Sequence, residues 1–215
     1  MTTEPTQVVH IVDDDRAMRE SMALMLELAG FRVLSFAGAR DFLASLTPER
    51  CGCLVLDHRM PEMTGLELQR ELLTRNVSLP IIFLSGFGDI PTTVRAVKSG
   101  AVDFLEKPVS KEILIERIQQ AFAADRRQRA LAAEEQAVRG RYAELTPRER
   151  EVFQLATRGL ANKEIARELD ISPRTVENHR ARVMEKMQAE NIAALCNMAR
   201  VCHSLDSSSS PSSSA

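Results

Sequence analysis

The sequence predicts an α/β domain with a doubly wound, five-stranded parallel sheet, followed by a second, all-α domain of four helices with a helix-turn-helix. Short, fully apolar runs alternate with amphipathic helical patterns up to residue 124, which is the order of a parallel sheet covered by helices on both faces. After residue 140 only helical patterns remain. The length of 215 residues also exceeds a typical single domain of about 150.

The five strands are predicted from apolar runs at residues 8–12, 32–35, 53–56, 81–84 and 104–105. A helix is predicted after each strand, over residues 16–29, 39–46, 65–74, 91–99 and 111–124. Gly30 and Gly100 mark two of the helix ends, and Asp15 is placed to cap a helix start. These boundaries place the first domain at residues 7–124.

Residues 125–140 are predicted to be a helical linker, since the segment 126–139 is rich in Ala, Arg, Glu and Gln and lacks Pro and Gly. We expect its basic start, Arg126 to Arg129, to be a solvated helix face. The second domain covers residues 141–203, where Thr146 and Ser172 each precede a Pro as helix caps. The Ser-rich residues 204–215 are expected to be disordered.

The composition, 44% apolar and 27% charged, is that of a globular protein. No apolar run approaches the length of about 20 residues that a membrane helix needs, and the first residues lack a signal-peptide pattern. Four scattered cysteines do not make a disulfide framework. We therefore expect a cytoplasmic protein with no membrane partner. Its first 124 residues carry a net charge of −4 and residues 141–203 one of +2, which favours different partners for the two domains.

Polar side chains gather at the predicted strand ends. Asp13 and Asp14 follow the first strand, Asp57 the third, Ser85 the fourth and Lys107 the fifth. The carboxyl ends of parallel strands share one edge, where α/β proteins bind ligands. Neighbouring carboxylates suit Mg²⁺, and a carboxylate beside that ion can become an aspartyl phosphate. The pattern favours Asp13 and Asp14 as metal ligands, Asp57 as the acceptor, and the hydroxyl and ammonium as phosphoryl partners.

Four segments in order, IVDDD, LVLDHRMPEMTGLEL, IIFLSGFGD and AVDFLEKP, resemble the receiver domain of two-component response regulators. The resemblance implies the flavodoxin-like strand order 2-1-3-4-5 and phosphoryl transfer from a sensor histidine kinase to Asp57. It also implies that the metal is Mg²⁺, held by Asp13, Asp14, Asp57 and the backbone carbonyl of Arg59. Ser85 matches the switch hydroxyl of such domains and Phe104 their switch aromatic.

Three residues depart from the usual receiver pattern. His58 follows the acceptor where Leu or Met is frequent, Phe87 stands where His is frequent, and Val109 stands where Phe is frequent. None of these departures removes a group with a proposed chemical role. His58 and Phe87 lie close to the acceptor in sequence or motif, so they bear on the lifetime of a phosphoryl group there.

Residues 162–169 and 173–187 are predicted to form a helix-turn-helix, whose second helix enters the major groove of DNA. The segment LTPREREVFQLATRGLANKEIARELDISPRTVENHRARVMEKM resembles the LuxR/NarL-type output domain. Together with the receiver it indicates the FixJ-like subfamily. The DNA-binding residues expected from the resemblance and from the charge of the second helix are Lys163, Arg174, Thr175, Glu177, Asn178, Arg180, Ala181, Arg182 and Lys186.

Two other functions fit part of the pattern. A phosphohydrolase of the haloacid dehalogenase type also uses an Asp nucleophile and Mg²⁺, and Asp13 and Asp15 satisfy its DxD motif. The Thr or Val expected after that motif is missing, and a helix-turn-helix has no evident role in such an enzyme. The second alternative is a DNA-binding protein whose receiver no longer takes phosphate and serves only for dimerisation.

We therefore expect a transcription regulator rather than an enzyme, whose only catalysis is its own Mg²⁺-dependent phosphorylation and dephosphorylation. Phosphorylation of Asp57 by a sensor histidine kinase is expected to make it a homodimer that binds double-stranded promoter DNA. Its face of residues 91–99, 104–106 and 111–124 is the expected dimer contact. Activation, through RNA polymerase, is the expected direction of control.

Overall fold

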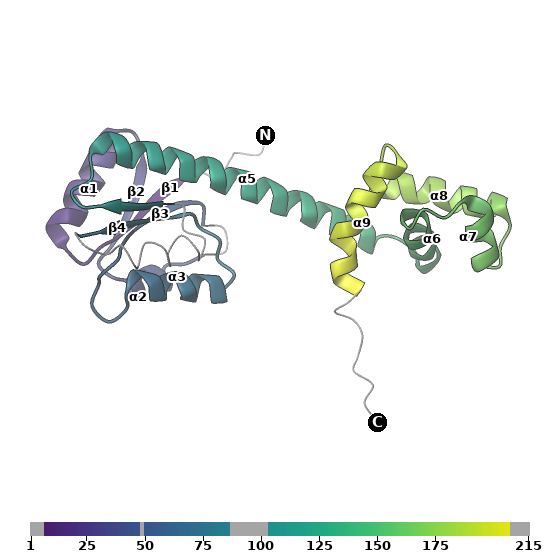
Figure 1. Cartoon of the computed structure of the whole chain (residues 1–215), viewed down its shortest axis with the longest axis horizontal. Coiled ribbons are helices and arrows are strands. Elements are labelled where there is room, and N and C mark those ends of the chain that lie inside the picture. Colours follow the sequence, from purple (N-terminus) through teal and green to yellow (C-terminus); the bar gives the residue numbers. More distant parts are fainter. Residues whose placement is uncertain (1–6, 48–49, 87–102, 207–215) are drawn as a thin grey trace, which may run out of the picture. The chain divides into compact units, whose positions relative to one another are not determined.

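The computed structural model describes residues 7–47, 50–86 and 103–206 (Figure 1). The chain divides into two compact units, residues 1–129 and 130–215. The predicted helix at residues 91–99, Phe87 and residues 207–215 of the predicted tail lie outside the described residues. Residues 204–206, which were expected to be disordered, are helical instead, because the last helix continues to Asp206. None of the described helices is both long enough and apolar enough to cross a membrane.

The first unit contains a parallel sheet in the order β2-β1-β3-β4-β5, as the sequence predicted. Three inner strands, β1, β3 and β4, are buried along their whole length, which explains their unbroken apolar sequences. The strands are β1 Val8–Val12, β2 Arg32–Phe36, β3 Gly52–Asp57, β4 Ile81–Ser85 and β5 Asp103–Glu106. The last strand is longer than predicted, because polar residues at both of its ends join the ladder.

The helices of this unit are α1 Arg16–Leu28, α2 Ala39–Ala44, α3 Gly65–Thr74 and α5 Lys111–Ala143. Asp15 caps α1 as predicted, since one of its carboxylate oxygens accepts from the backbone N–H groups of Ala17 at 2.9 Å and Met18 at 3.1 Å. At α3, Thr64 and Glu67 form a capping box. The first cap lies three residues after the end of β1, and the second begins α3 after the loop of residues 58–64 that follows Asp57.

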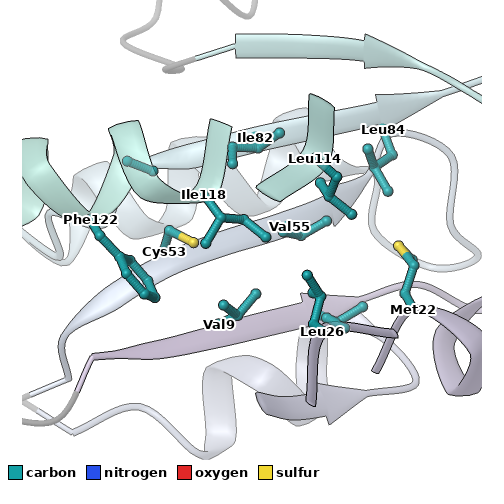
Figure 2. Close-up of a cluster of buried hydrophobic side chains, with 12 residues drawn as sticks. Val9, Met22, Leu26, Cys53, Val55, Ile82, Leu84, Leu114, Ile118 and Phe122 are labelled. Carbon is teal, nitrogen blue, oxygen red and sulfur yellow. The ribbon is translucent and has the colours of Figure 1, made fainter. Parts of the chain in front are cut away.

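Alternating residues of the sheet feed two separate cores. On β3, Leu54 and Leu56 pack with Phe42 and Leu68 of α2 and α3. The intervening Cys53 and Val55 face the other way and pack with side chains of α1 and α5, as Figure 2 shows for Met22, Leu26, Leu114 and Ile118. The sheet is thus covered on both faces, and its strand ends are held rigidly at the edge that carries the aspartates.

Helix α5 continues without a break from Lys111 to Ala143. The linker is helical as predicted, but its two ends belong to the compact units. Arg129 still belongs to the first unit, five residues beyond the expected receiver end, while Val138 and Tyr142 are buried in the core of the second unit. The expectation that Arg126 to Arg129 is a solvated face is wrong for Arg129, which bonds Asp125 and the loop before β3.

The second unit is all helical, with α6 Pro147–Thr157, α7 Asn162–Glu168, α8 Pro173–Met187 and α9 Ile192–Asp206 after the end of α5. Thr146 with Glu149 forms a capping box at α6, and Ser172 caps α8 by accepting from Thr175 N–H at 3.1 Å. The predicted stripe of Val176, Val183 and Met187 is buried. Val176 packs with Ile165 of α7, whereas Val183 and Met187 pack with side chains of α5, α6 and α9. Each buried side chain stabilises this packing by about 1.5–3 kcal/mol.

Candidate functional site: an acidic pocket and a helix-turn-helix surface

The carboxyl edge of the sheet brings together Asp13, Asp57 and Lys107. The ammonium nitrogen of Lys107 donates to Asp13 Oδ2 at 2.8 Å and to Asp57 Oδ1. Both aspartates are buried, whereas Asp14 is exposed. The sequence places these groups far apart, and the parallel sheet makes them neighbours because β1, β3 and β5 all end at this edge.

Asp57 is held in a defined orientation by the turn that follows it. Its second oxygen, Oδ2, accepts from the backbone N–H of Arg59 at 2.8 Å, and the N–H of His58 donates to the Leu84 carbonyl at 2.9 Å. Burial raises the pKa of Asp57 above its ordinary value, the nearby Lys107 opposes that rise, and the charge of Asp13 adds to it. Asp57, the predicted acceptor, is thus a buried carboxylate in contact with the ammonium of Lys107.

The turn after β1 is fixed by two hydrogen bonds. Asp13 Oδ1 accepts from the backbone N–H of Asp15 at 2.9 Å, and Arg19 donates to the Asp13 carbonyl at 2.7 Å. Arg19 has this role although the sequence analysis did not identify it, since a single Arg on a helix is usually a solvated residue. Burial lowers the pKa of Lys107, but its hydrogen bonds to the two carboxylates prevail and the net shift is upward. The lysine therefore stays charged.

Ser85 and Phe104 both lie beside this pocket. Ser85 ends β4 and is buried; its carbonyl accepts from Lys107 N–H at 2.7 Å, while its hydroxyl donates to the Gly86 carbonyl at 3.2 Å. Phe104 is half-buried and stacks on Phe83, with ring centroids 6.1 Å apart. The ring of His58 lies 6.3 Å from that of Phe104, so the departure at position 58 adjoins the predicted switch aromatic.

The first turn of α3 approaches the acceptor strand closely because residue 65 is glycine. A Cβ on Gly65 would lie 2.6 Å from the carbonyl oxygen of Asp57 and 3.0 Å from the ring of Phe83. No Cβ fits there unless the backbone moves. The glycine therefore lets α3 begin directly beside Asp57.

Two of the three predicted acidic metal ligands converge. In the described ranges no group of three or more His, Cys, Asp or Glu side chains is arranged to hold a metal ion. Asp14 instead lines a groove of about 340 Å³ beside the pocket, together with Arg40 and Glu62. Mg²⁺ is commonly bound through one or two carboxylates with water completing its shell, and the oxygens of Asp13 and Asp57 fit that requirement.

The predicted DNA-binding side chains lie on or beside α8. Thr175 and Arg180 are half-buried, and the exposed members of the set are Lys163, Arg174, Glu177, Asn178, Ala181 and Arg182. Arg180 donates to the side-chain oxygen of Asn162 at 2.8 Å, a partner on α7 that the sequence analysis missed. The contact links the two helices of the motif through the guanidinium predicted to meet DNA.

Lys186 differs from the other predicted DNA-binding residues. Its ammonium donates to Glu149 Oε2 at 2.7 Å and to the Glu144 carbonyl at 3.3 Å. Glu149 is buried, and its hydrogen bond to Lys186 lowers its pKa to about 2. This ion pair joins α8 to α6, so we remove Lys186 from the proposed DNA surface. No local pattern marks this pair, because its members lie 37 residues apart.

Models of known protein families match both parts of the chain. The model of the response regulator receiver domain matches residues 9–119, and that of the bacterial regulatory proteins of the luxR family matches residues 143–199. The transcriptional regulatory protein FixJ of Rhizobium meliloti is 46% identical over 191 residues, covering 89% of this chain and 94% of its own. The response regulator protein TodT of Pseudomonas putida is 42% identical over 193 residues, covering 90% and 85%.

Two solved structures extend over both domains. The response regulator StyR is 41% identical with a TM-score of 0.80, covering 91% of this chain and 99% of its own. Full-length FixJ from B. japonicum is 42% identical with a TM-score of 0.55, covering 94% and 99%. The phosphohydrolase alternative is thereby excluded. The chain belongs to the two-component response regulators that join a receiver domain to a LuxR-type DNA-binding domain, and it is a regulator of transcription rather than an enzyme.

Proposed function

We propose that a sensor histidine kinase phosphorylates this response regulator on Asp57, and that the phosphorylated protein dimerises and binds promoter DNA. The observation that carries the proposal is the contact of one ammonium, that of Lys107, with the carboxylates of both Asp57 and Asp13. A buried carboxylate at the end of a strand, with a cation already beside it, is placed to receive a negatively charged phosphoryl group.

Mg²⁺ fits the same pocket. Asp13 and Asp57 would bind it directly, the backbone carbonyl of Arg59 would add a third protein oxygen, and water would fill the rest of the shell. When bound, the ion supplies positive charge to the oxygens of the transferring phosphoryl group. Asp13 has a second part in this arrangement, since it positions the ammonium of Lys107 as well.

Phosphorylation replaces the single negative charge of the Asp57 carboxylate with a phosphoryl charge of about −1.5 to −2 and brings new acceptor oxygens. Lys107 would donate to those oxygens, and the Ser85 hydroxyl, which now donates to the Gly86 carbonyl, would turn to them. Phe104 would then change its packing against Phe83 and His58. A charge change at the acceptor thereby alters the face of β5 and the start of α5, the receiver's proposed dimer contact, which also includes residues 91–99 outside the described range.

Dimerisation is expected to matter for DNA binding because one output domain carries little net charge. Residues 141–203 have 11 basic and 9 acidic side chains, so a single domain would bind weakly and lose affinity quickly with salt. Two linked domains on adjacent half-sites convert the second contact into an intramolecular one. The protein would act in the cytoplasm on promoter DNA and activate transcription through RNA polymerase.

The DNA surface that we propose divides into two kinds of contact. Glu177, Asn178 and Ala181 would meet base edges, with Asn suited to adenine and Glu to cytosine. The remaining residues, which would contact phosphates or the groove wall, are Lys163, Arg174, Thr175, Arg180 and Arg182. Phosphate contacts fix the position of the helix, whereas base contacts give sequence preference.

The test is DNA binding by the full chain with and without acetyl phosphate and Mg²⁺. A duplex is first selected from a random library with the treated wild-type protein. We expect treatment to tighten binding of wild type and to leave Asp57→Asn unchanged. Equal and tight binding by untreated wild type and by the Asn variant would instead support a receiver that dimerises without phosphate.

A further inference from the structure

A second buried charged cluster lies at the opposite edge of the sheet from Asp57. The carboxylate of Asp125, on α5, is 2% exposed. It accepts from the backbone N–H of Gly52 at 3.0 Å and from the Nε of Arg129 at 3.0 and 3.1 Å. The response-regulator chemistry described above uses none of these groups.

The cluster extends from α5 into the loop that precedes β3. Arg129 also donates to the carbonyl oxygen of Arg50. The guanidinium of Arg50 lies over the ring of Phe42, 5.0 Å from its centroid, and donates to Ser45 Oγ at 2.9 Å. The guanidinium of Arg50 is therefore held by contacts with Phe42 and Ser45, and that of Arg129 by Asp125 on α5. The loop before β3 lies between these two sets of contacts.

Gly52 has to be a glycine for this cluster to form. Its φ is +117°, and a Cβ would lie 1.9 Å from the carbonyl oxygen of Val8. In this conformation its N–H points to Asp125 rather than to a strand partner. The start of β3 is thus shaped to present a donor to α5.

The cluster is the last tertiary anchor of α5 within the first unit. Every side chain from residue 126 to residue 137 is exposed except that of Arg129, which is half-buried, and the next buried residue is Val138 in the core of the second unit. An isolated helix shorter than about 12–15 residues is marginal in water. The exposed stretch therefore depends on its two ends, the cluster at one and Val138 at the other.

Helix α5 also begins next to the acceptor pocket. Lys107 precedes its first turn by four residues, and Leu114, Ile118 and Phe122 fix the helix along the sheet. Helix α5 thus begins four residues after Lys107, continues to the carboxylate of Asp125, and from there enters the exposed stretch.

We propose that Asp125 and Arg129 are positioning residues which, with Gly52 and the Arg50 carbonyl, clamp α5 where it leaves the receiver. The clamp keeps residues 130–137 helical and carries the state of the receiver toward the output domain. The effect of the clamp on the helicity of residues 130–137 is independent of phosphorylation. Its effect on the output domain rests on the proposed function, because it needs phosphorylation of Asp57 to change DNA binding.

The test compares Arg129→Gln and Asp125→Asn with wild type in the full chain. Arg127→Gln is the matched control, since it removes the same charge from an exposed neighbour on the same helix. The first measurement is amide hydrogen exchange over residues 130–137. We expect both clamp variants to exchange at least about tenfold faster there, the change expected on losing one hydrogen bond to a charged group. The control is expected to match wild type.

The second measurement is the gain in affinity for the selected duplex on treatment with acetyl phosphate and Mg²⁺. We expect both clamp variants to be phosphorylated to the wild-type extent. The fold-increase in their affinity for the duplex should be at least about fivefold smaller than that of wild type. Unchanged exchange over residues 130–137 would overturn the clamp. Faster exchange together with a wild-type increase in DNA affinity would show that the clamp stabilises the helix locally but does not couple the receiver to DNA binding. If wild type itself shows no gain, the proposed function fails, and the exchange result still decides the clamp.

Asp125→Asn removes a buried charge partner and is the variant more prone to misfold. Exchange protection of β1 and β3, measured in the same experiment, reports whether the receiver is folded. Arg129→Gln leaves the hydrogen bond between Gly52 and Asp125 in place, so the proposal is decided on this variant if the other does not fold.

Discussion

The ammonium of Lys107 lies 2.8 Å from the carboxylate of Asp13, a residue 94 positions earlier in the chain. The same ammonium also contacts Asp57. The acceptor pocket is therefore assembled by the ends of β1, β3 and β5, and its charge balance depends on one lysine.

Replacing Lys107 by Met is expected to slow phosphorylation of Asp57 by acetyl phosphate about a hundredfold, the usual cost of removing one charged donor at a reacting oxygen. Two buried carboxylates would be left without their cation, which raises the pKa of Asp57 further. Intact mass against time measures the rate. Lys111→Met, on an exposed residue at the start of α5, is the control and is expected to react like wild type.

Gly65→Ala is expected to destabilise the receiver by about 1–3 kcal/mol, the usual cost of overpacking, because the added methyl meets the Asp57 carbonyl oxygen. It should also slow phosphorylation by displacing the acceptor strand. Gly38→Ala is the control, since a Cβ there meets no atom within 4 Å. The stability of each variant is measured by denaturant unfolding, monitored by circular dichroism. Equal unfolding midpoints for the two variants would contradict the packing argument.

The ion pair of Glu149 with Lys186 predicts a pH dependence of the output domain. The hydrogen bond from Lys186 lowers the pKa of Glu149 to about 2, below its ordinary value of 4.5. Its stabilising contribution is therefore present above pH 4.5 and is lost as the pH falls toward 2. Glu149→Gln should lower the free energy of unfolding by about 1.5–3 kcal/mol at pH 7, and the difference from wild type should shrink in acid.

Tyr142 makes this measurement specific to the output domain. It is the only Tyr in a chain without Trp, and it is buried in that domain against Phe153. Its fluorescence therefore follows the unfolding of that domain alone. A difference between the variant and wild type that stays constant from pH 7 to pH 2.5 would contradict the assigned pair.

Arg180→Ala is expected to weaken DNA binding on all sequences, while Asn178→Ala is expected to alter sequence preference. Because Asn162 holds the Arg180 guanidinium, Asn162→Ala should weaken binding in the same general way, and the double variant should lose less than the two single losses combined. Binding to a panel of duplexes measures this. Arg200→Gln, exposed on α9, is the control for loss of charge. Matching profiles for the variants at 178 and 180 would refute the division of roles.

The strands and the helix-turn-helix were predictable because each has a local pattern: unbroken apolar runs for β1, β3 and β4, and the buried stripe of Val176, Val183 and Met187 on α8. The strand order came from the resemblance to receiver domains. The convergence of Asp13, Asp57 and Lys107 was also predictable, since parallel strands end at one edge. The ion pairs of Lys186 with Glu149 and of Arg129 with Asp125, and the hydrogen bond from the Gly52 N–H to Asp125, were not. Their partners come from separate elements or from a segment that resembles a solvated helix, and no periodicity marks them.

The most direct test of the central claim is the intact mass of wild type and of Asp57→Asn after incubation with acetyl phosphate and Mg²⁺. We predict that wild type gains one phosphoryl group, that the variant gains none, and that a chelator blocks the gain. A gain of equal size in the variant would contradict Asp57 as the acceptor, and a gain unaffected by the chelator would contradict the role of the metal. No gain in wild type, even with a histidine kinase as donor, would contradict the phosphorylation account as a whole.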